Sequence, residues 1–279
     1  MYFEKKHDYL ICVDSDGTIM DTMTIKHNSC FGPCFIKVFG IKTNIEDILN
    51  HWNHTNLYSK DRGINRFQGL KEILIYINKK YNIHFDDEEK FYSWVNVTPR
   101  FDIKLLKDEL GHDPSNYVIK KAMEWSNLVN EEIAKLPLPV EFGYVKESLE
   151  KASKFASLLG VSSANKDAVN NEWKQRGLLS YFAFVACQDE GSKKDIIRNA
   201  LKLGYKKENV IMLGDAMGDY FASRDNDVKF YPIIPTKENS CWKEFSENVL
   251  DIISNGNYSK EIEKEYIDRF MDFLENGGN

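Results

Sequence analysis

The chain has 279 residues, of which 42% are hydrophobic and 29% charged, a composition typical of globular proteins. This length corresponds to one large domain or two ordinary ones, with enough chain to bury a core without disulfide or metal staples. Its 37 basic and 43 acidic residues give a net charge of −6, so we expect no nucleic-acid partner. The mean hydropathy of −0.47 and the absence of a long apolar run exclude an integral membrane protein.

The N-terminal residues and the cysteines favour a cytoplasmic protein. The apolar run that begins at Tyr9 stops at Asp14, which is too short for a secretory leader. The five cysteines are an odd number without a C-x-x-C pair, so we expect unpaired thiols in a reducing compartment. Cys30 and Cys34 could share a helix face, but two thiols without a neighbouring ligand pair make a poor zinc site.

The first predicted element is a strand over residues 9–13, an unbroken apolar run. Such a run suits a strand that is covered on both faces of a parallel sheet. A polar turn over residues 14–18 follows at the carboxyl end of this strand, the edge at which open α/β sheets bind ligands.

Residues 21–136 show helical periodicity and little strand patterning. Leu70, Ile73, Leu74 and Ile77, for example, recur at the spacing of one helix face. Prolines at positions 137 and 139 then interrupt the chain. We therefore predict a large helical domain over residues 21–139, inserted into the rest of the chain.

An alternation of strands and helices follows this insert. The predicted strands cover residues 156–161, 182–187, 210–213 and 228–231, and the predicted helices begin near residues 145, 168 and 193. Alternating strands and helices indicate a parallel sheet with right-handed crossovers. The predicted fold class is therefore α/β, with a Rossmann-like parallel-sheet core formed by residues 1–20 and 140–279.

Polar residues follow three of the predicted strands, and a lysine opens the helix that starts at residue 193. These side chains would meet at one edge of the sheet: Asp14, Asp16, Ser162, Lys193, Asp215 and Asp219. Converging carboxylates repel one another unless a hard cation lies between them, and oxygen ligands of this kind suit Mg²⁺. A hydroxyl and an ammonium beside such a metal suit a phosphoryl group, so the pattern indicates phosphoryl transfer.

The order of these motifs resembles that of the haloacid dehalogenase superfamily of phosphohydrolases. Residues 14–19 match its first motif, D-x-D-G-T followed by a hydrophobic residue, and Val161-Ser162 matches the second. Lys193 matches the third motif, and residues 211–219 match the fourth, hydrophobic residues followed by G-D-x-x-x-D. The helical insert lies where this superfamily places its first type of cap, C1.

The resemblance implies a role for each residue. Asp14 would be the nucleophile, and Asp16 the general acid and then the base for the hydrolytic water. Ser162 would bind the phosphoryl oxygens and Lys193 would pair with the nucleophile and the phosphoryl charge. The implied ligands of Mg²⁺ are Asp14, the backbone carbonyl of Asp16, Asp215 and Asp219, and the implied substrate-binding residues of the core are Gly17, Thr18 and Ser163. The implied activity is a Mg²⁺-dependent phosphatase for a small phosphorylated metabolite.

Several alternative roles fit the same residues. Asp14 and Asp16 are also turn formers, Ser162 is also a helix cap, and Lys194 stands beside Lys193. Either Ser162 or Ser163 could be the phosphoryl ligand. A phosphomutase of the same superfamily fits the same motifs, and a phospho-aspartate signalling module fits them less well because its acceptor lies in mid-chain. The substrate and the oligomeric state are not readable from the sequence.

Four residues of the insert are candidates for contacts with the substrate. Lys26 and His27 lie where the chain leaves the core, which predicts a place near the mouth of the site. Arg62 and Arg66 are four residues apart, so on a helix they would share a face and could clamp an anionic substrate. Gly63 between them could instead mark a loop, and both arginines could be ordinary solvated charges.

Overall fold

The computed structural model describes residues 2–98 and 103–277. The chain divides into two compact units, Met1–Met23 with Leu138–Asn279 and Thr24–Pro137. The first unit contains all the strands of the described chain, and the second is helical over its described residues.

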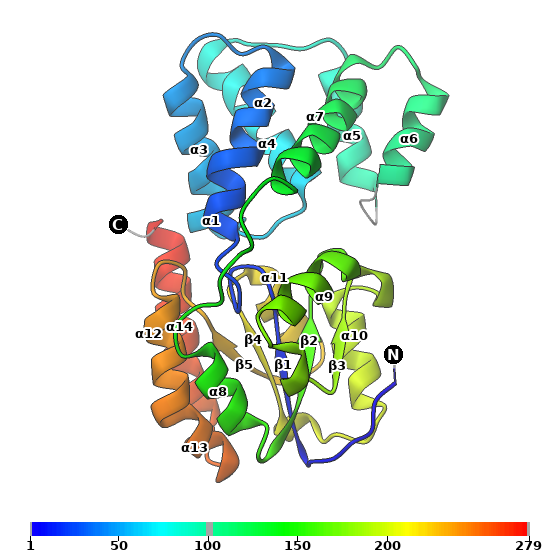
Figure 1. Ribbon diagram of the computed structural model, residues 1–279. Helices are drawn as coiled ribbons and strands as arrows, with labels where there is room; N and C mark the ends of the chain where they lie inside the picture. Colours follow the sequence, from blue (N-terminus) through cyan, green and yellow to red (C-terminus); the bar gives the residue numbers. More distant parts are fainter. Residues whose placement is uncertain (1, 99–102, 278–279) are drawn as a thin grey trace. The chain divides into compact units, whose positions relative to one another are not determined.

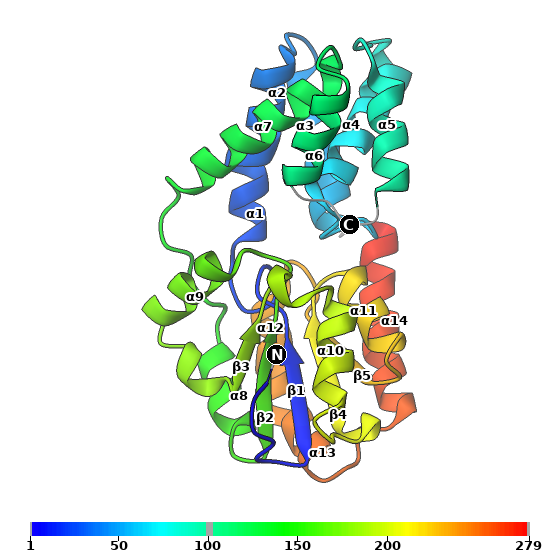
Figure 2. The same cartoon turned by 90° about the vertical axis from the view of Figure 1, so that its right-hand side faces the viewer.

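The five strands form one parallel sheet in the order β3-β2-β1-β4-β5 (Figures 1 and 2). Their bounds are β1 Tyr9–Val13, β2 Ala156–Val161, β3 Phe184–Ala186, β4 Val210–Gly214 and β5 Lys229–Pro232. The first strand of the chain lies at the centre, and Val13 at its end pairs with Gly160 on one side and Leu213 on the other. The predicted fold class, a Rossmann-like α/β core, is confirmed.

Helices cover both faces of this sheet. They are α8 Val145–Ala152, α9 Lys166–Gln175, α10 Lys193–Leu201, α11 Met217–Arg224, α12 Glu238–Glu244, α13 Leu250–Ser254 and α14 Lys260–Asn276. The pair α10 and α11 lies on one face, and α8, α12 and α13 lie on the other (Figures 1 and 2). Because neither face is open to water, every residue of β2 and β4 is buried, as their unbroken apolar runs predict.

The helical unit packs around an aromatic core. Its helices are α1 Met23–Lys26, α2 Gly32–Phe39, α3 Ile45–Tyr58, α4 Arg66–Tyr81, α5 Glu88–Val97, α6 Ile103–His112 and α7 Tyr117–Ile133, with a π-helical turn, His27–Phe31, between α1 and α2. The stripe from Leu70 to Ile77 is buried on α4, and it packs in one cluster with Trp52 and Trp125. The helical spacing of these hydrophobic residues in the sequence therefore identifies the buried face of α4.

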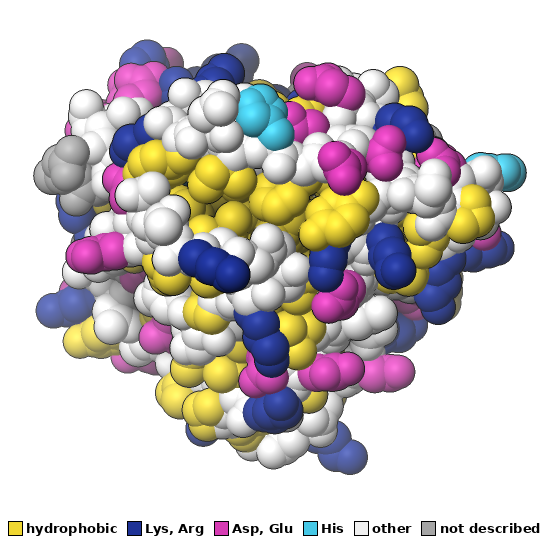
Figure 3. All heavy atoms as spheres, turned by 90° about the horizontal axis from the view of Figure 1, so that it is seen from above, with side chains coloured by type: hydrophobic (Ala, Val, Ile, Leu, Met, Phe, Trp, Pro, Cys, Tyr) yellow, Lys and Arg dark blue, Asp and Glu magenta, His cyan; other side chains and the backbone are white. Residues whose placement is uncertain are grey.

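The cysteines and the hydropathy of the helices can be compared with the sequence, as can the charges on one face of the helical unit. All five cysteines are buried free thiols, as expected. Among the described residues, no helix is both long and apolar enough to cross a membrane. On the face of the helical unit that Figure 3 shows, basic and acidic side chains are interspersed around hydrophobic ones.

Candidate active site

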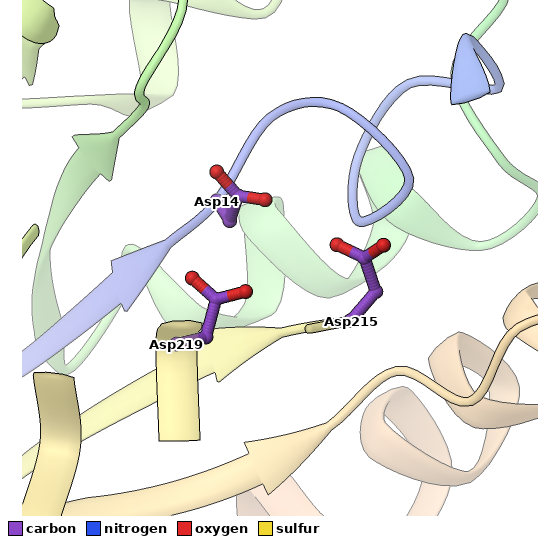
Figure 4. Close-up of side chains that lie close together, drawn as sticks. All are labelled: Asp14, Asp215 and Asp219. Carbon is purple, nitrogen blue, oxygen red and sulfur yellow. The ribbon is translucent and has the colours of Figure 1, made fainter. Parts of the chain in front are cut away.

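Two of the predicted site residues follow neighbouring strands. Asp14 continues β1 and its backbone N–H donates to the carbonyl of Leu213 over 3.0 Å, while Asp215 follows directly after β4. Because β1 and β4 are parallel neighbours, their carboxyl ends meet at one edge of the sheet. The carboxylates of Asp14, Asp215 and Asp219 lie close together there (Figure 4).

Asp219 reaches this edge from the first turn of α11. It is fully buried, and one of its oxygens accepts a hydrogen bond from the backbone N–H of Ala216 over 3.2 Å. Gly214 makes room for it, since a Cβ at position 214 would lie 2.2 Å from the Asp219 Cγ. The glycine of the G-D-x-x-x-D motif is therefore required by the close approach of a carboxylate.

Lys193 joins two of these carboxylates. Its Nζ lies 2.9 Å from the Asp14 Oδ1 and 2.6 Å from the Asp219 Oδ1. Lys193 is the first residue of α10, whose start is capped by the Ser192 hydroxyl. Lys194 points elsewhere and pairs with Asp225 over 2.7 Å. Of the two candidate lysines, Lys193 is thus the one placed at the carboxylate cluster.

Burial and mutual repulsion shift the pKa values of the residues in this cluster. It raises the pKa of Asp14 well above its ordinary value, and repulsion from Asp219 and Asp215 adds to this effect while Lys193 opposes it. The pKa of Asp219 is raised for the same main reason. Burial alone would lower the pKa of Lys193, but Asp14 and Asp219 outweigh it and raise that pKa.

The three carboxylates fit a divalent cation. Each offers a ligand oxygen, and these oxygens all lie within 4.8 Å of one another. Carboxylate oxygens are the ligands that Mg²⁺ prefers, and a positive ion among them would offset the repulsion that raises their pKa values. The Asp16 side chain is not part of this three-carboxylate cluster.

The loop after β1 supports the cluster through Thr18. Gly17 adopts a left-handed φ of 80°, which lets the chain turn sharply. The buried Thr18 hydroxyl then donates to the Asp215 Oδ1 over 2.7 Å and lies 3.5 Å from the Asp14 Oδ2. Gly17 and Thr18, predicted to bind substrate, are thus placed where they shape the loop and hold a carboxylate.

Asp16, the second aspartate of the first motif, is half-buried. The buried hydroxyl of Thr22 donates to its Oδ1 over 2.6 Å. Asp14 therefore contacts the Lys193 ammonium, and Asp16 contacts the Thr22 hydroxyl. Thr22 was not among the predicted residues, although a hydroxyl six positions after Asp16 is a signal that could have identified it.

Two buried tryptophans also hold this loop. The Trp242 indole donates to the backbone carbonyl of Thr18 over 2.7 Å, and the Trp173 indole donates to the Ser15 Oγ over 3.1 Å. These partners are 224 and 158 residues apart in the chain. No local pattern in the sequence could have identified such long-range contacts.

The two serines after β2 differ in exposure. Ser162 is buried, and its hydroxyl accepts a hydrogen bond from the Ala164 N–H over 3.1 Å. Ser163 is exposed to solvent. The N-terminus of α9 is capped by the Asn165 side chain, so the alternative that Ser162 caps this helix is wrong.

The four candidates of the insert all lie in the helical unit. Lys26 ends α1, and His27 is buried with its Nδ1 3.1 Å from the Trp52 indole nitrogen, which donates to it. Of the two alternatives for Arg62 and Arg66, a shared helix face is wrong and a loop between them is confirmed, because Asn65 caps α4 and the helix begins at Arg66. Gly63, with a left-handed φ of 73°, lies in the preceding turn.

Neither arginine is an ordinary solvated charge. Arg62 is buried and donates to the carbonyl of Leu57 over 2.8 Å. Arg66 is half-buried and contacts α7. The two side chains therefore have separate environments within the helical unit.

The parallel sheet and the carboxylates at the ends of its central strands define an α/β protein with a candidate active site at one edge of the sheet. The family model described as "Haloacid dehalogenase-like hydrolase" matches residues 64–233, more than half of the chain. The chain belongs to this family. The first motif lies before the matched stretch, and the structure brings it beside the fourth motif, which lies within that stretch.

Solved structures with the same fold have low sequence identity. One from Haemophilus somnus 129pt has a TM-score of 0.51 and 14% identity, covering 88% of this chain and 99% of its own. One from Lactobacillus delbrueckii subsp. bulgaricus has a TM-score of 0.52 and 14% identity, covering 81% and 86% respectively. Their descriptions name a putative and a predicted phosphoglycolate phosphatase, respectively for Lactobacillus delbrueckii and Haemophilus somnus. Among curated proteins, no sequence matches the chain.

Proposed function

We propose that this protein is a Mg²⁺-dependent phosphatase that hydrolyses monoesters of small phosphorylated metabolites through a phosphorylated Asp14. The observation that carries the proposal is the buried cluster of Asp14, Asp215 and Asp219 around Lys193. Three carboxylates at this spacing would hold the metal, which supplies charge neutralisation for the phosphoryl oxygens. The description of the two solved structures as phosphatases agrees with this proposal.

In the proposed first step, a carboxylate oxygen of Asp14 attacks phosphorus and the bond from phosphorus to the ester oxygen breaks. Lys193, 2.9 Å from Asp14, favours the ionised form of the nucleophile against the effect of burial and would offer its ammonium to the phosphoryl oxygens. Asp16 transfers its proton to the leaving ester oxygen, so the alcohol departs neutral. The Thr22 hydroxyl, 2.6 Å from the Asp16 Oδ1, orients this carboxyl group.

The second step reverses the role of Asp16. Its carboxylate takes a proton from a water molecule as the water oxygen attacks phosphorus, and the bond between phosphorus and Asp14 breaks. Inorganic phosphate leaves, and both aspartates return to their starting protonation. We propose that the hydroxyl of Ser162, which is buried just after β2, donates a hydrogen bond to a phosphoryl oxygen.

The experiment that tests this function is a panel of phosphate monoesters incubated with the full chain and Mg²⁺. We expect released phosphate from one or more esters and none from the same panel with Asp14→Asn. If phosphate moved to a second sugar hydroxyl instead, the protein would be a phosphomutase. An acyl phosphate that persisted for seconds without turnover would indicate a signalling module.

A further inference from the structure

Ser15, the residue between the two aspartates of the first motif, is fully buried. The carboxylate of Asp14 before it contacts Lys193 of α10. Successive side chains along a strand point to opposite sides of the chain. The Ser15 side chain accordingly meets a different helix, α9, where its Oγ accepts a hydrogen bond from the Trp173 indole over 3.1 Å. The nucleophile and the residue next to it are therefore held by two different helices.

The Trp173 indole is packed tightly, which makes it a fixed donor. The side chain is fully buried, and its ring lies 4.6 Å from that of Phe182, centroid to centroid. The ring also lies against β2 at Gly160, where an added Cβ would be 3.0 Å from two of its carbons. Gly160 pairs with Val13, the last residue of β1. The bare backbone at position 160 thus gives the indole the room that it needs to reach Ser15.

Ser15 also organises the turn that carries Asp16. Its backbone carbonyl accepts hydrogen bonds from the N–H groups of Ile19 and Met20, both over 2.9 Å. A displacement of Ser15 would therefore move this turn as well as Asp14. Since the attacking oxygen must lie in line with the leaving group, a small displacement of Asp14 slows the attack on phosphorus more than it weakens substrate binding.

We propose that Trp173 is a positioning residue for the reaction, whose hydrogen bond to the Ser15 Oγ holds the backbone of the first motif so that Asp14 is in place to attack phosphorus. This inference rests on the proposed phosphatase function, and it assigns a role to a residue outside all four motifs. Trp173 acts through Ser15 and not on the substrate. Both residues belong to the α/β unit, so the tie between them needs nothing from the helical unit.

A double-mutant cycle tests this tie. Trp173→Phe keeps an aromatic ring and loses the donor, whereas Ser15→Ala removes only the acceptor oxygen and tests the tie even if Trp173→Phe folds poorly. Each should lower kcat for p-nitrophenyl phosphate by about 10- to 100-fold with little change in KM. Release of p-nitrophenol in a single turnover should show that the phosphorylation of Asp14 is the slowed step. The double variant should be no slower than the slower single variant, because the same bond is lost in all three.

The stability of the same variants should respond differently from their turnover. Ser15→Ala leaves the buried indole N–H without its acceptor, and Trp173→Phe leaves the Ser15 hydroxyl without its donor. The double variant leaves neither group unpaired, so its unfolding temperature should fall by less than the sum of the two single falls. Its kcat should stay low, because the tie is still absent.

The matched control is Tyr258→Phe. It removes another buried donor of the α/β unit, the hydroxyl that donates to the carbonyl of Phe230 over 2.9 Å. This variant should also lower the unfolding temperature, but its kcat should equal that of the wild-type chain. A bond that is merely structural at Trp173 would give the same result as this control.

Hydrogen exchange provides a readout that needs no turnover. The carbonyl of Ser15 accepts the N–H groups of Ile19 and Met20, so these amides should exchange faster once Ser15 is released. Mass spectrometry of the peptide that contains them should show faster exchange in Trp173→Phe and in Ser15→Ala than in Tyr258→Phe.

These measurements separate the inference from the proposed function. An unchanged kcat in both single variants would overturn the positioning role, as would a double variant whose loss equals the product of the two single losses. Equal exchange in the Trp173, Ser15 and Tyr258 variants would also overturn it. If the wild-type chain hydrolysed no ester, the proposed function would fail, whereas hydrogen exchange would still decide whether Trp173 holds the loop of the first motif.

Discussion

The two aspartates of the first motif lie two residues apart and contact different side chains. Asp14 contacts the ammonium of Lys193, and Asp16 accepts a hydrogen bond from the Thr22 hydroxyl. The ammonium of Lys193 favours the ionised form of Asp14, and the Thr22 hydroxyl orients the carboxyl group of Asp16. In the proposed mechanism, Asp14 is the nucleophile and Asp16 carries the proton between substrate and water.

Substitution of each aspartate should therefore produce a different defect. Asp14→Asn should form no acyl phosphate. Asp16→Asn should still be phosphorylated by an ester with a good leaving group, but turn over about 10²- to 10⁴-fold more slowly because its proton carrier is lost. Mass spectrometry of acid-quenched protein locates the phosphoryl group, and phosphate release gives the rate. Normal turnover by Asp14→Asn, or a phosphoryl group on another residue, would refute the assignment.

Gly214 offers a second test at the residue scale. Gly214→Ala places a methyl group 2.2 Å from the Asp219 Cγ, so this carboxylate must move away from the cluster. We expect a loss of about 1–3 kcal/mol in the free energy of unfolding from overpacking. We also expect a fall of about 10²-fold in turnover, because small displacements of catalytic groups have effects of that size. Denaturant unfolding and p-nitrophenyl phosphate hydrolysis measure the two quantities.

The matched control is Gly218→Ala, four residues further on. An added Cβ at Gly218 meets no atom within 4 Å, so this variant should keep its activity and gain slightly in stability from the better helix former. Equal effects of the two substitutions would show that the close approach at Gly214 is unimportant.

At the scale of elements, a helix near the C-terminus supports the catalytic loop. Trp242 of α12 donates to the carbonyl of Thr18, whose hydroxyl in turn donates to Asp215. The family match ends at residue 233, before this helix begins. Helix α12 thus adds a support for the loop from outside the matched stretch.

Loss of the indole N–H should weaken both stability and metal binding. In Trp242→Phe the Thr18 carbonyl stays buried without its donor, which should cost about 1–3 kcal/mol in the free energy of unfolding. Because Thr18 also holds Asp215, the Mg²⁺ concentration for half-maximal activity should rise several-fold. The control is Trp125→Phe, which removes an indole bond to the Phe31 carbonyl in the helical unit. It should lose stability without a change in the Mg²⁺ requirement, and a similar change in both variants would argue against the proposed support.

At the scale of the whole molecule, the carboxylate cluster links metal binding to both activity and stability. EDTA should abolish phosphate release, and Mg²⁺ should restore it. Ca²⁺ should restore little, because its looser coordination allows bidentate binding of Asp14 and spoils the attack geometry. Mg²⁺ should also raise the unfolding temperature of the wild-type chain, since it binds only the folded state, and should raise that of Asp215→Asn less. Full activity after removal of all metal would contradict a metal-dependent phosphatase.

The sequence by itself determined the fold class and the positions of most elements. Strands at 9–13 and 156–161 coincide with the predicted ranges, because unbroken apolar runs between polar turns admit few alternatives. The helix predicted to begin near residue 168 instead begins at Lys166, after the cap formed by Asn165. Helix ends depend on local capping, and they are less strongly encoded than helix faces.

The tertiary structure decided which of the candidate residues act together. The order of motifs indicated Asp14, Lys193, Asp215 and Asp219, but only the pairing of β1 with β4 brings the carboxylates within 4.8 Å. Local sequence could not separate Lys193 from Lys194, because the direction of a side chain depends on what packs against the helix. The contacts of Trp242 and Arg66 join residues that are distant in the chain, and only folding brings such residues together.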